Sequence, residues 1–206
     1  MKAVVLHQPY ATLVALGIKT IETRPSPPNG PMRPDGVRGL PGLPIDRGER
    51  IAIVAGAKRP DPMVDLGREW RVIYEADAYG ELDTVWAVTH RTRGYHLLPL
   101  GAVVCTVVVD DALPMVRWDE GGPSGTTDES PVLELGTPDG DEVLTLWPRG
   151  DVEGSEVPFT DQLPYGDYAP GRWGWMLSDP RPCDPIPCKG RQGVFRLPDE
   201  IAEALP

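Results

Sequence analysis

The sequence predicts a single α+β domain built on a small, mostly antiparallel β-barrel that short helices flank. Several short runs rich in Val and Ile are typical of strands, and few segments show a helical period. The 25 prolines and 23 glycines indicate many turns and long loops rather than long helices. A chain of 206 residues is long enough for one domain with a substantial core. We therefore treat residues 1–206 as one domain.

The first expected elements are a strand, a short helix and a second strand. Residues 2–6 form an apolar run rich in β-branched side chains, which favours a buried strand. Pro9 suits the first turn of a helix, where its missing N–H costs nothing, and residues 11–16 continue that helix. Gly17 suits the left-handed position just past a helix end. Residues 19–24 then form the next strand.

The middle of the chain contains the most apolar strands. Residues 49–57 include the run Ile-Ala-Ile-Val-Ala, which predicts a strand. Asp61 suits a helix N-cap, and the helix after it has an apolar stripe made by Leu66, Trp70 and Ile73. Residues 102–109 form the strongest strand, and their apolar run predicts burial on both faces. We expect Asp110 and Asp111 to end it.

The last third of the chain is predicted to add short strands. Residues 142–147 suit one arm of a hairpin, and residues 172–177 form a strand that puts Trp173 and Trp175 on one face. Four segments follow: a proline-punctuated connection, a small basic turn, a short strand and a closing helix, at residues 179–187, 189–193, 194–197 and 199–205. Asp199 is the expected cap of that helix.

Two long loops, at residues 25–48 and 117–164, interrupt this pattern. The first contains seven prolines and five glycines, and its arginines suit a basic flap. The net charge is −11, and residues 117–165 hold twelve acidic residues but only two basic ones. This acidic segment is either solvated surface or an element that mimics a polyanion or contacts a basic protein partner.

Composition also excludes some functional classes. No apolar run reaches about 18 residues, so we expect no membrane helix, and the apolar run at the start is too short for a signal peptide. The three cysteines are an odd number without an accompanying Cys or His pair motif, which fits a reducing cytoplasm and no metal site. We expect no cofactor, and the oligomeric state is open. The negative net charge argues against a nucleic-acid interface that binds many phosphates. A local basic groove is still compatible with the rest of the chain, which is nearly neutral outside the acidic segment.

Functional side chains concentrate in residues 17–24, GIKTIETR. Side chains alternate between the two faces of a strand, so Glu22 and Arg24 share a face. Lys19 has the opposite parity and joins them only if it sits on the turn that enters the strand. The trio is either an ordinary ion pair on an edge strand or part of a ligand site.

Four further motifs accompany this octet: Gln8-Pro9-Tyr10 at a helix start, LPLGAVV at residues 98–104, GRWGW at residues 171–175 and KGRQG at residues 189–193. Together they resemble the ASCH domain family, whose hallmark is G-x-K-x-x-E-x-R after a Q-P-W-like helix start. The resemblance covers residues 1–24, 49–58, 97–116 and 165–198, and it leaves both long loops unexplained.

The resemblance implies a PUA-like β-barrel with a cleft that the hallmark residues line and that binds RNA or nucleotides. It also implies enzymatic alternatives, because some members act as ribonucleases and small members hydrolyse N-acylated cytidines. Those amidohydrolases carry a threonine where this sequence has Glu22, which argues against their mechanism here. Tyr10 replaces the usual tryptophan, and Val54 stands where many members have a histidine.

The predicted function is recognition of a short single-stranded RNA or a modified nucleotide. Arginines bind phosphate as forks, and aromatic faces stack on bases with about 1–3 kcal/mol each. Two alternatives are a metal-independent hydrolase that uses Lys19 and Glu22 as catalytic residues, and a protein-interaction module that uses residues 117–164. Glu22 favours the charged form of Lys19, so we prefer binding to catalysis. The predicted ligand-binding residues are His7, Gln8, Tyr10, Lys19, Glu22, Arg24, Arg172, Trp173, Trp175, Lys189, Arg191 and Gln192.

Overall fold

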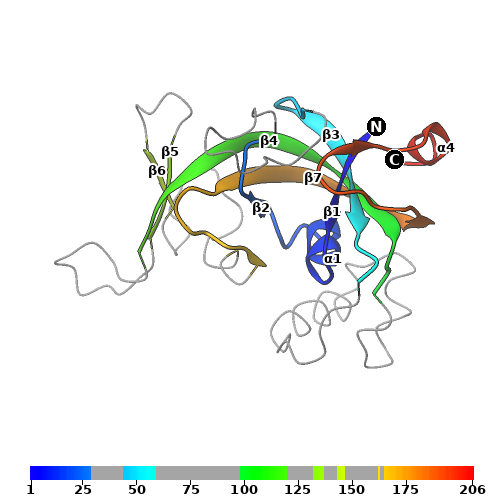
Figure 1. The fold of residues 1–206 in the computed structure, drawn as a ribbon, viewed down its shortest axis with the longest axis horizontal. Coiled ribbons are helices and arrows are strands. Elements are labelled where there is room, and N and C mark those ends of the chain that lie inside the picture. The colour runs from blue at the N-terminus through cyan, green and yellow to red at the C-terminus, as the bar shows by residue number, and fades with distance from the viewer. Residues whose placement is uncertain (29–43, 59–97, 120–131, 137–142, 147–161, 163–164) are drawn as a thin grey trace.

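Over the residues that it describes, the structure is a mixed α+β fold built on one curved sheet (Figure 1). The computed structural model describes residues 1–28, 44–58, 98–119, 132–136, 143–146, 162 and 165–206. Six strands follow one another across the sheet in the order β2-β7-β4-β3-β1-β8. Their bounds are β1 Lys2–Leu6, β2 Ile21–Arg24, β3 Glu49–Ala55, β4 Ala102–Asp119, β7 Trp173–Pro187 and β8 Phe195–Arg196.

The sheet does not close into a barrel within the described residues. The prediction of an α+β fold is confirmed, and the prediction of a closed β-barrel is wrong for this part of the chain. β2 and β8 are the two ends of the strand order and do not pair with each other. They contain four and two residues, and a barrel closes only when its two end strands pair with each other. Instead, a side chain crosses from β2 to β1: Arg24 Nη2 donates a hydrogen bond of 3.0 Å to the Val5 carbonyl.

Two long antiparallel strands, β4 and β7, pair with each other at the centre of the sheet. The prediction that Asp110 and Asp111 end β4 is wrong. The pairing of β4 with β7 shifts its register between Val109 and Asp111, and it resumes with Asp111 opposite Met176. The predicted connection at residues 179–187 is likewise part of β7. β2 pairs only with residues up to Met176, so the proline-rich half of β7 is an edge on that side, where a missing N–H costs no ladder bond.

The predicted strands at the start and centre of the chain are confirmed. β1 runs parallel to β3 with Val4 opposite Ile53, and β3 runs antiparallel to β4. The apolar run that begins β4 is buried from Ala102 to Val107, as expected for a strand covered on both faces. The main core cluster includes the buried side chains of Val4, Leu6, Ile51, Ile53, Val104, Val107 and Trp175.

The described helices are short. α1, Tyr10–Ala15, has Ala11, Leu13 and Val14 buried and contacts β3 and β4. It is followed by Gly17 at φ 71°, the left-handed position that the sequence predicts. The closing helix α4, Asp199–Ala202, is a single turn whose N-cap is Pro198, so the expected Asp199 cap is wrong. No described helix is long and apolar enough to cross a membrane.

The far end of β4 carries the predicted hairpin. β5, Val132–Gly136, pairs antiparallel with β4, and β6, Val143–Leu146, pairs antiparallel with β5. The helix expected after Asp61 lies outside the described residues, as do residues 29–43 of the first loop and most of the acidic segment.

Candidate functional site

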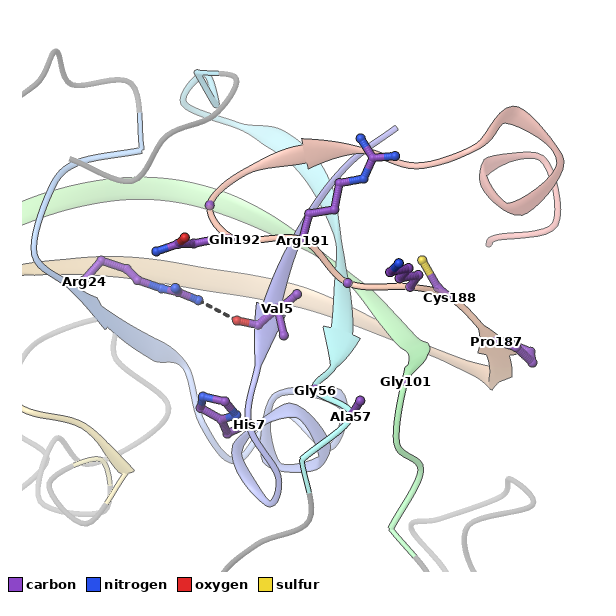
Figure 2. Close-up of a pocket in the computed structure, with 13 residues that line it drawn as sticks. Val5, His7, Arg24, Gly56, Ala57, Gly101, Pro187, Cys188, Arg191 and Gln192 are labelled. Atoms are coloured by element: carbon purple, nitrogen blue, oxygen red, sulfur yellow. Dashed lines mark hydrogen bonds between the residues drawn. The ribbon is translucent and has the colours of Figure 1, made fainter. Parts of the chain in front are cut away.

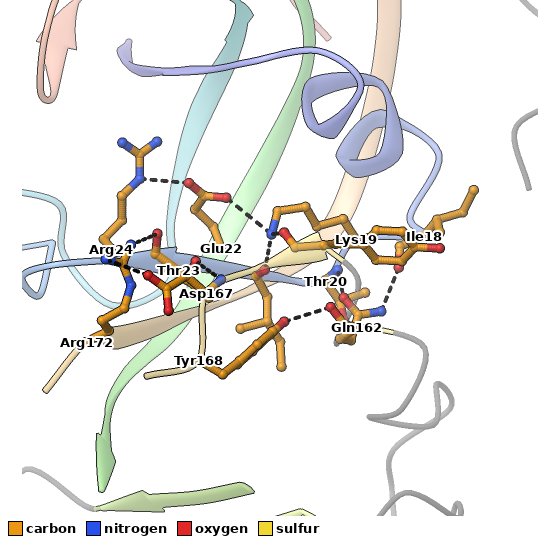
Figure 3. Close-up of polar contacts among 12 residues, drawn as sticks. Ile18, Lys19, Thr20, Glu22, Thr23, Arg24, Gln162, Asp167, Tyr168 and Arg172 are labelled. Atoms are coloured by element: carbon orange, nitrogen blue, oxygen red, sulfur yellow. Dashed lines mark hydrogen bonds and ion pairs between the residues drawn. The ribbon is translucent and has the colours of Figure 1, made fainter. Parts of the chain in front are cut away.

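The motif residues Lys19, Glu22 and Arg24 meet in one chain of ionic contacts (Figure 3). Lys19 Nζ lies 3.3 Å from Glu22 Oε2, and Arg24 Nε lies 2.8 Å from Glu22 Oε1. Glu22 and Arg24 are two residues apart on β2 and share a face, as strand parity predicts. Lys19 precedes the strand, which lets its side chain reach the same face.

The Lys19 ammonium is enclosed by the protein. Its side chain is only 1% exposed. Besides the Glu22 contact, Nζ donates to the carbonyls of Ile21 at 2.5 Å and Tyr165 at 2.7 Å, so all three of its protons have an oxygen partner. Burial lowers the pKa of Lys19, the Glu22 carboxylate opposes that shift, and the Arg24 charge adds to it.

The Arg24 side chain has three contacts within the protein and also lines a pocket. Its guanidinium contacts Glu22, donates to the Val5 carbonyl and lies 5.8 Å from the centre of the Trp175 ring. Trp175 is itself fixed, because it is 1% exposed and its Nε1 donates to the Ser26 carbonyl at 3.1 Å. Arg24 therefore presents its charge from a pre-set position.

A second layer of polar contacts supports this network from the C-terminal half of the chain. Gln162 accepts a hydrogen bond from Thr20 N at 2.8 Å and donates one to the Ile18 carbonyl at 2.6 Å, which fixes the turn that carries Lys19 (Figure 3). The Tyr168 hydroxyl donates to the Gln162 carbonyl at 3.0 Å. Burial and the negative charge of Glu22 both raise the pKa of Tyr168.

A pocket of about 950 Å³ lies beside this network (Figure 2). We call it the Arg24 pocket. Arg24 is the one motif residue of the trio that lines it. The other lining residues come from β1, the end of β3, the start of β4 and the segment between β7 and β8: Val5, His7, Gly56, Ala57, Gly101, Pro187, Cys188, Lys189, Gly190, Arg191, Gln192 and Gly193.

The lining of the Arg24 pocket is cationic in a protein whose net charge is −11. It contains Arg24, Lys189 and Arg191, together with the imidazole of His7 and the amide of Gln192. None of the described lining residues is an aspartate or a glutamate. An arrangement of this kind can bind an anion with charge-assisted hydrogen bonds.

The predicted site residues fall into two groups. His7, Arg24, Lys189, Arg191 and Gln192 line the Arg24 pocket. The others lie outside its lining: Gln8, Tyr10, Lys19, Glu22, Arg172, Trp173 and Trp175.

Several residues of the second group have structural contacts. Gln8 is buried, donates to the Pro99 carbonyl at 2.9 Å and accepts from the Thr12 hydroxyl at 2.9 Å. Arg172 contacts Asp167 at 3.2 Å and the Thr23 carbonyl at 3.4 Å, and Trp173 packs against the core. Tyr10 lies with its ring centre 5.8 Å from Lys19 Nζ.

Sequence reasoning missed the residues that shape the pocket without carrying charge. Gly190 is the clearest, because a Cβ on it would lie 2.6 Å from Val5 Cγ2. It also missed Gln162 and Tyr165, whose contacts with residues 18–21 span more than 140 positions in the chain. The one available signal was the pair of glycines in the KGRQG turn, which indicates close backbone approach.

Comparison with known proteins does not assign a family. No family model matches the chain, and no curated protein matches it significantly. Among the described residues, no group of three or more His, Cys, Asp or Glu side chains could hold a metal ion.

Proposed function

We propose that this protein binds a nucleotide, or a short single-stranded RNA, in the Arg24 pocket, and that it is a PUA-like protein of the ASCH type. One observation carries the proposal: a pocket with two arginines, a lysine and a histidine and with no described carboxylate, in a chain of net charge −11. The negative total charge of the protein repels anions in general, so a local cationic pocket indicates a specific anionic ligand.

The size of the pocket fits a small ligand rather than a long nucleic acid. Its volume of about 950 Å³ is at the upper end of the range of about 300–1,000 Å³ that small-molecule sites occupy. Phosphate is the natural partner of arginine forks and lysine, while His7 and Gln192 offer a stacking face and a donor–acceptor pair for a base. Recognition of one to a few nucleotides follows from this combination.

The hydrolase alternative has weaker support. A lowered pKa would suit Lys19 as a general base, but its three protons are committed to oxygen atoms and its side chain is 1% exposed. Glu22 is 12% exposed and contacts both Lys19 and Arg24. Neither residue lines the Arg24 pocket, so a substrate bound there would meet Arg24 first. The interaction alternative rests on the acidic segment, most of which lies outside the described residues.

The test is calorimetric titration of the protein with the four nucleoside 5′-monophosphates and with a tetranucleotide RNA. Arg24→Gln should weaken binding by about tenfold or more, because it removes a charge-assisted contact. Arg196→Gln is the matched control: Arg196 is exposed on β8 and does not line the pocket, so binding should be unchanged.

Circular dichroism should show that both variants fold, and Arg24→Lys, which keeps the charge, gives a second measure if Arg24→Gln is unstable. The proposal fails if no nucleotide or RNA binds to the wild type, or if Arg24→Gln and Arg196→Gln bind equally well.

A further inference from the structure

The segment between β7 and β8 forms a turn, residues 189–193, that is anchored at both ends. Before it, Cys188 N donates to the Gly101 carbonyl at 2.8 Å, which ties the turn to the start of β4. After it, Phe195 pairs with Ala3 of β1, and Leu197 N donates to the Met1 carbonyl at 3.0 Å. The turn is therefore held against the sheet before any ligand arrives.

Gly190 fixes how closely the turn approaches β1. A Cβ at this position would lie 2.6 Å from Val5 Cγ2, closer than real Cβ contacts allow. Val5 lines the same pocket and its carbonyl holds Arg24. The backbone of the turn thus packs directly against Val5, and both Gly190 and Val5 line the pocket.

Within the described part of the chain, the N–H groups of residues 189–193 donate to no backbone or side-chain acceptor. The side chains of Lys189 and Arg191, two residues of the same turn, are exposed and form no ion pair with a described carboxylate. Free backbone donors next to side-chain cations are the usual components of a phosphate site.

The cations of the pocket come from two separate elements: Arg24 from β2, and Lys189 and Arg191 from the turn at residues 189–193. In the view of Figure 2, Arg24 and Cys188, the residue before the turn, lie on opposite sides of Val5, and the Arg191 side chain extends from the turn away from Arg24. A ligand that spans the pocket can therefore contact the turn at one end and Arg24 and His7 at the other.

We propose that the turn at residues 189–193 is a phosphate subsite that takes a terminal phosphate monoester. This inference rests on the proposed function and narrows it: the ligand is a nucleoside monophosphate or the phosphorylated end of an RNA, rather than an internal part of a chain. A monoester carries up to two negative charges and three free oxygens, which match two cations and several N–H groups. An internal diester has one charge and a substituent on each side, so it offers the turn less charge and fewer free oxygens.

The experiment compares five probes by calorimetry: the tightest-binding nucleoside monophosphate, its nucleoside, the matching dinucleoside monophosphate without a terminal phosphate, the same dinucleotide with one, and inorganic phosphate. The two probes with a terminal phosphate should bind at least about tenfold more tightly than their partners without it. The double variant Lys189→Gln/Arg191→Gln should abolish that difference, while the control Arg196→Gln should preserve it.

The outcomes separate this inference from the proposed function. If the nucleoside and the unphosphorylated dinucleotide bind as tightly as their phosphorylated partners, the phosphate subsite is wrong and nucleotide binding stands. If the double variant weakens all probes equally, the turn does not read the phosphate and the inference is also wrong. If inorganic phosphate binds through the turn but no nucleotide binds more tightly, the subsite stands and the proposed function fails.

Discussion

Replacing Lys19 with methionine tests whether the buried ammonium holds the motif together. Methionine keeps the length of the side chain but removes its donors. The carbonyls of Ile21 and Tyr165 then lose hydrogen bonds of 2.5 and 2.7 Å, each worth about 1–3 kcal/mol when the acceptor stays buried. Relief of the desolvation of Lys19 offsets part of this loss, and Glu22 keeps its contact with Arg24.

The net effect should be a loss of about 3 kcal/mol in the free energy of unfolding. For a domain of this size, a loss of that magnitude lowers the Tm by roughly 6–12 °C. Urea and thermal unfolding followed by circular dichroism measure both quantities. Lys58→Met is the matched control, because Lys58 is exposed and should change stability by less than about 0.5 kcal/mol. A Lys19→Met variant as stable as wild type would show that the three oxygen contacts do not support the fold.

Three more predictions concern the pH dependence of stability, the approach of Gly190 to Val5 and the reactivity of Cys188. Because burial lowers the pKa of Lys19, the unfolded chain binds this proton more tightly than the folded protein does. The stability of wild type relative to Lys19→Met should therefore rise with pH between the lowered pKa and 10.5, measured by urea unfolding across that range. Gly190→Ala should weaken nucleotide binding, since its Cβ collides with Val5, and Val5→Ala in the same chain should restore it, as calorimetry would show. Burial raises the pKa of the Cys188 thiol and the Arg191 charge opposes it, so alkylation of Cys188 followed by mass spectrometry should be slow and slower still in Arg191→Gln.

Local patterns were sufficient to predict most strands and the arrangement of the motif. β-branched runs identified β1, β3 and the first half of β4 because these residues suit a buried pleated surface. Strand parity correctly put Glu22 and Arg24 on one face, and the left-handed backbone at Gly17 follows from its position after a helix. In each case neighbours in the sequence determine the geometry.

What the sequence did not predict depends on contacts between distant segments. β4 continues through Asp110 because β7 pairs with it beyond a register shift, and a local reading sees only two acidic residues. The enclosure of Lys19 depends on the Tyr165 carbonyl, 146 positions away. The Arg24 pocket forms where the turn at residues 189–193 meets β1, a contact that leaves no mark in the sequence except a glycine.

The hydrogen bond from Arg24 to the Val5 carbonyl has a mechanical consequence. It joins two strands, β2 and β1, that no backbone ladder connects. Rotation about a few single bonds of the Arg24 side chain is enough to break this hydrogen bond, whereas a ladder separates only when several bonds break together. A bound ligand that draws the Arg24 guanidinium away from the Val5 carbonyl would therefore remove this direct link, although β2 and β1 stay in the same sheet through β7, β4 and β3.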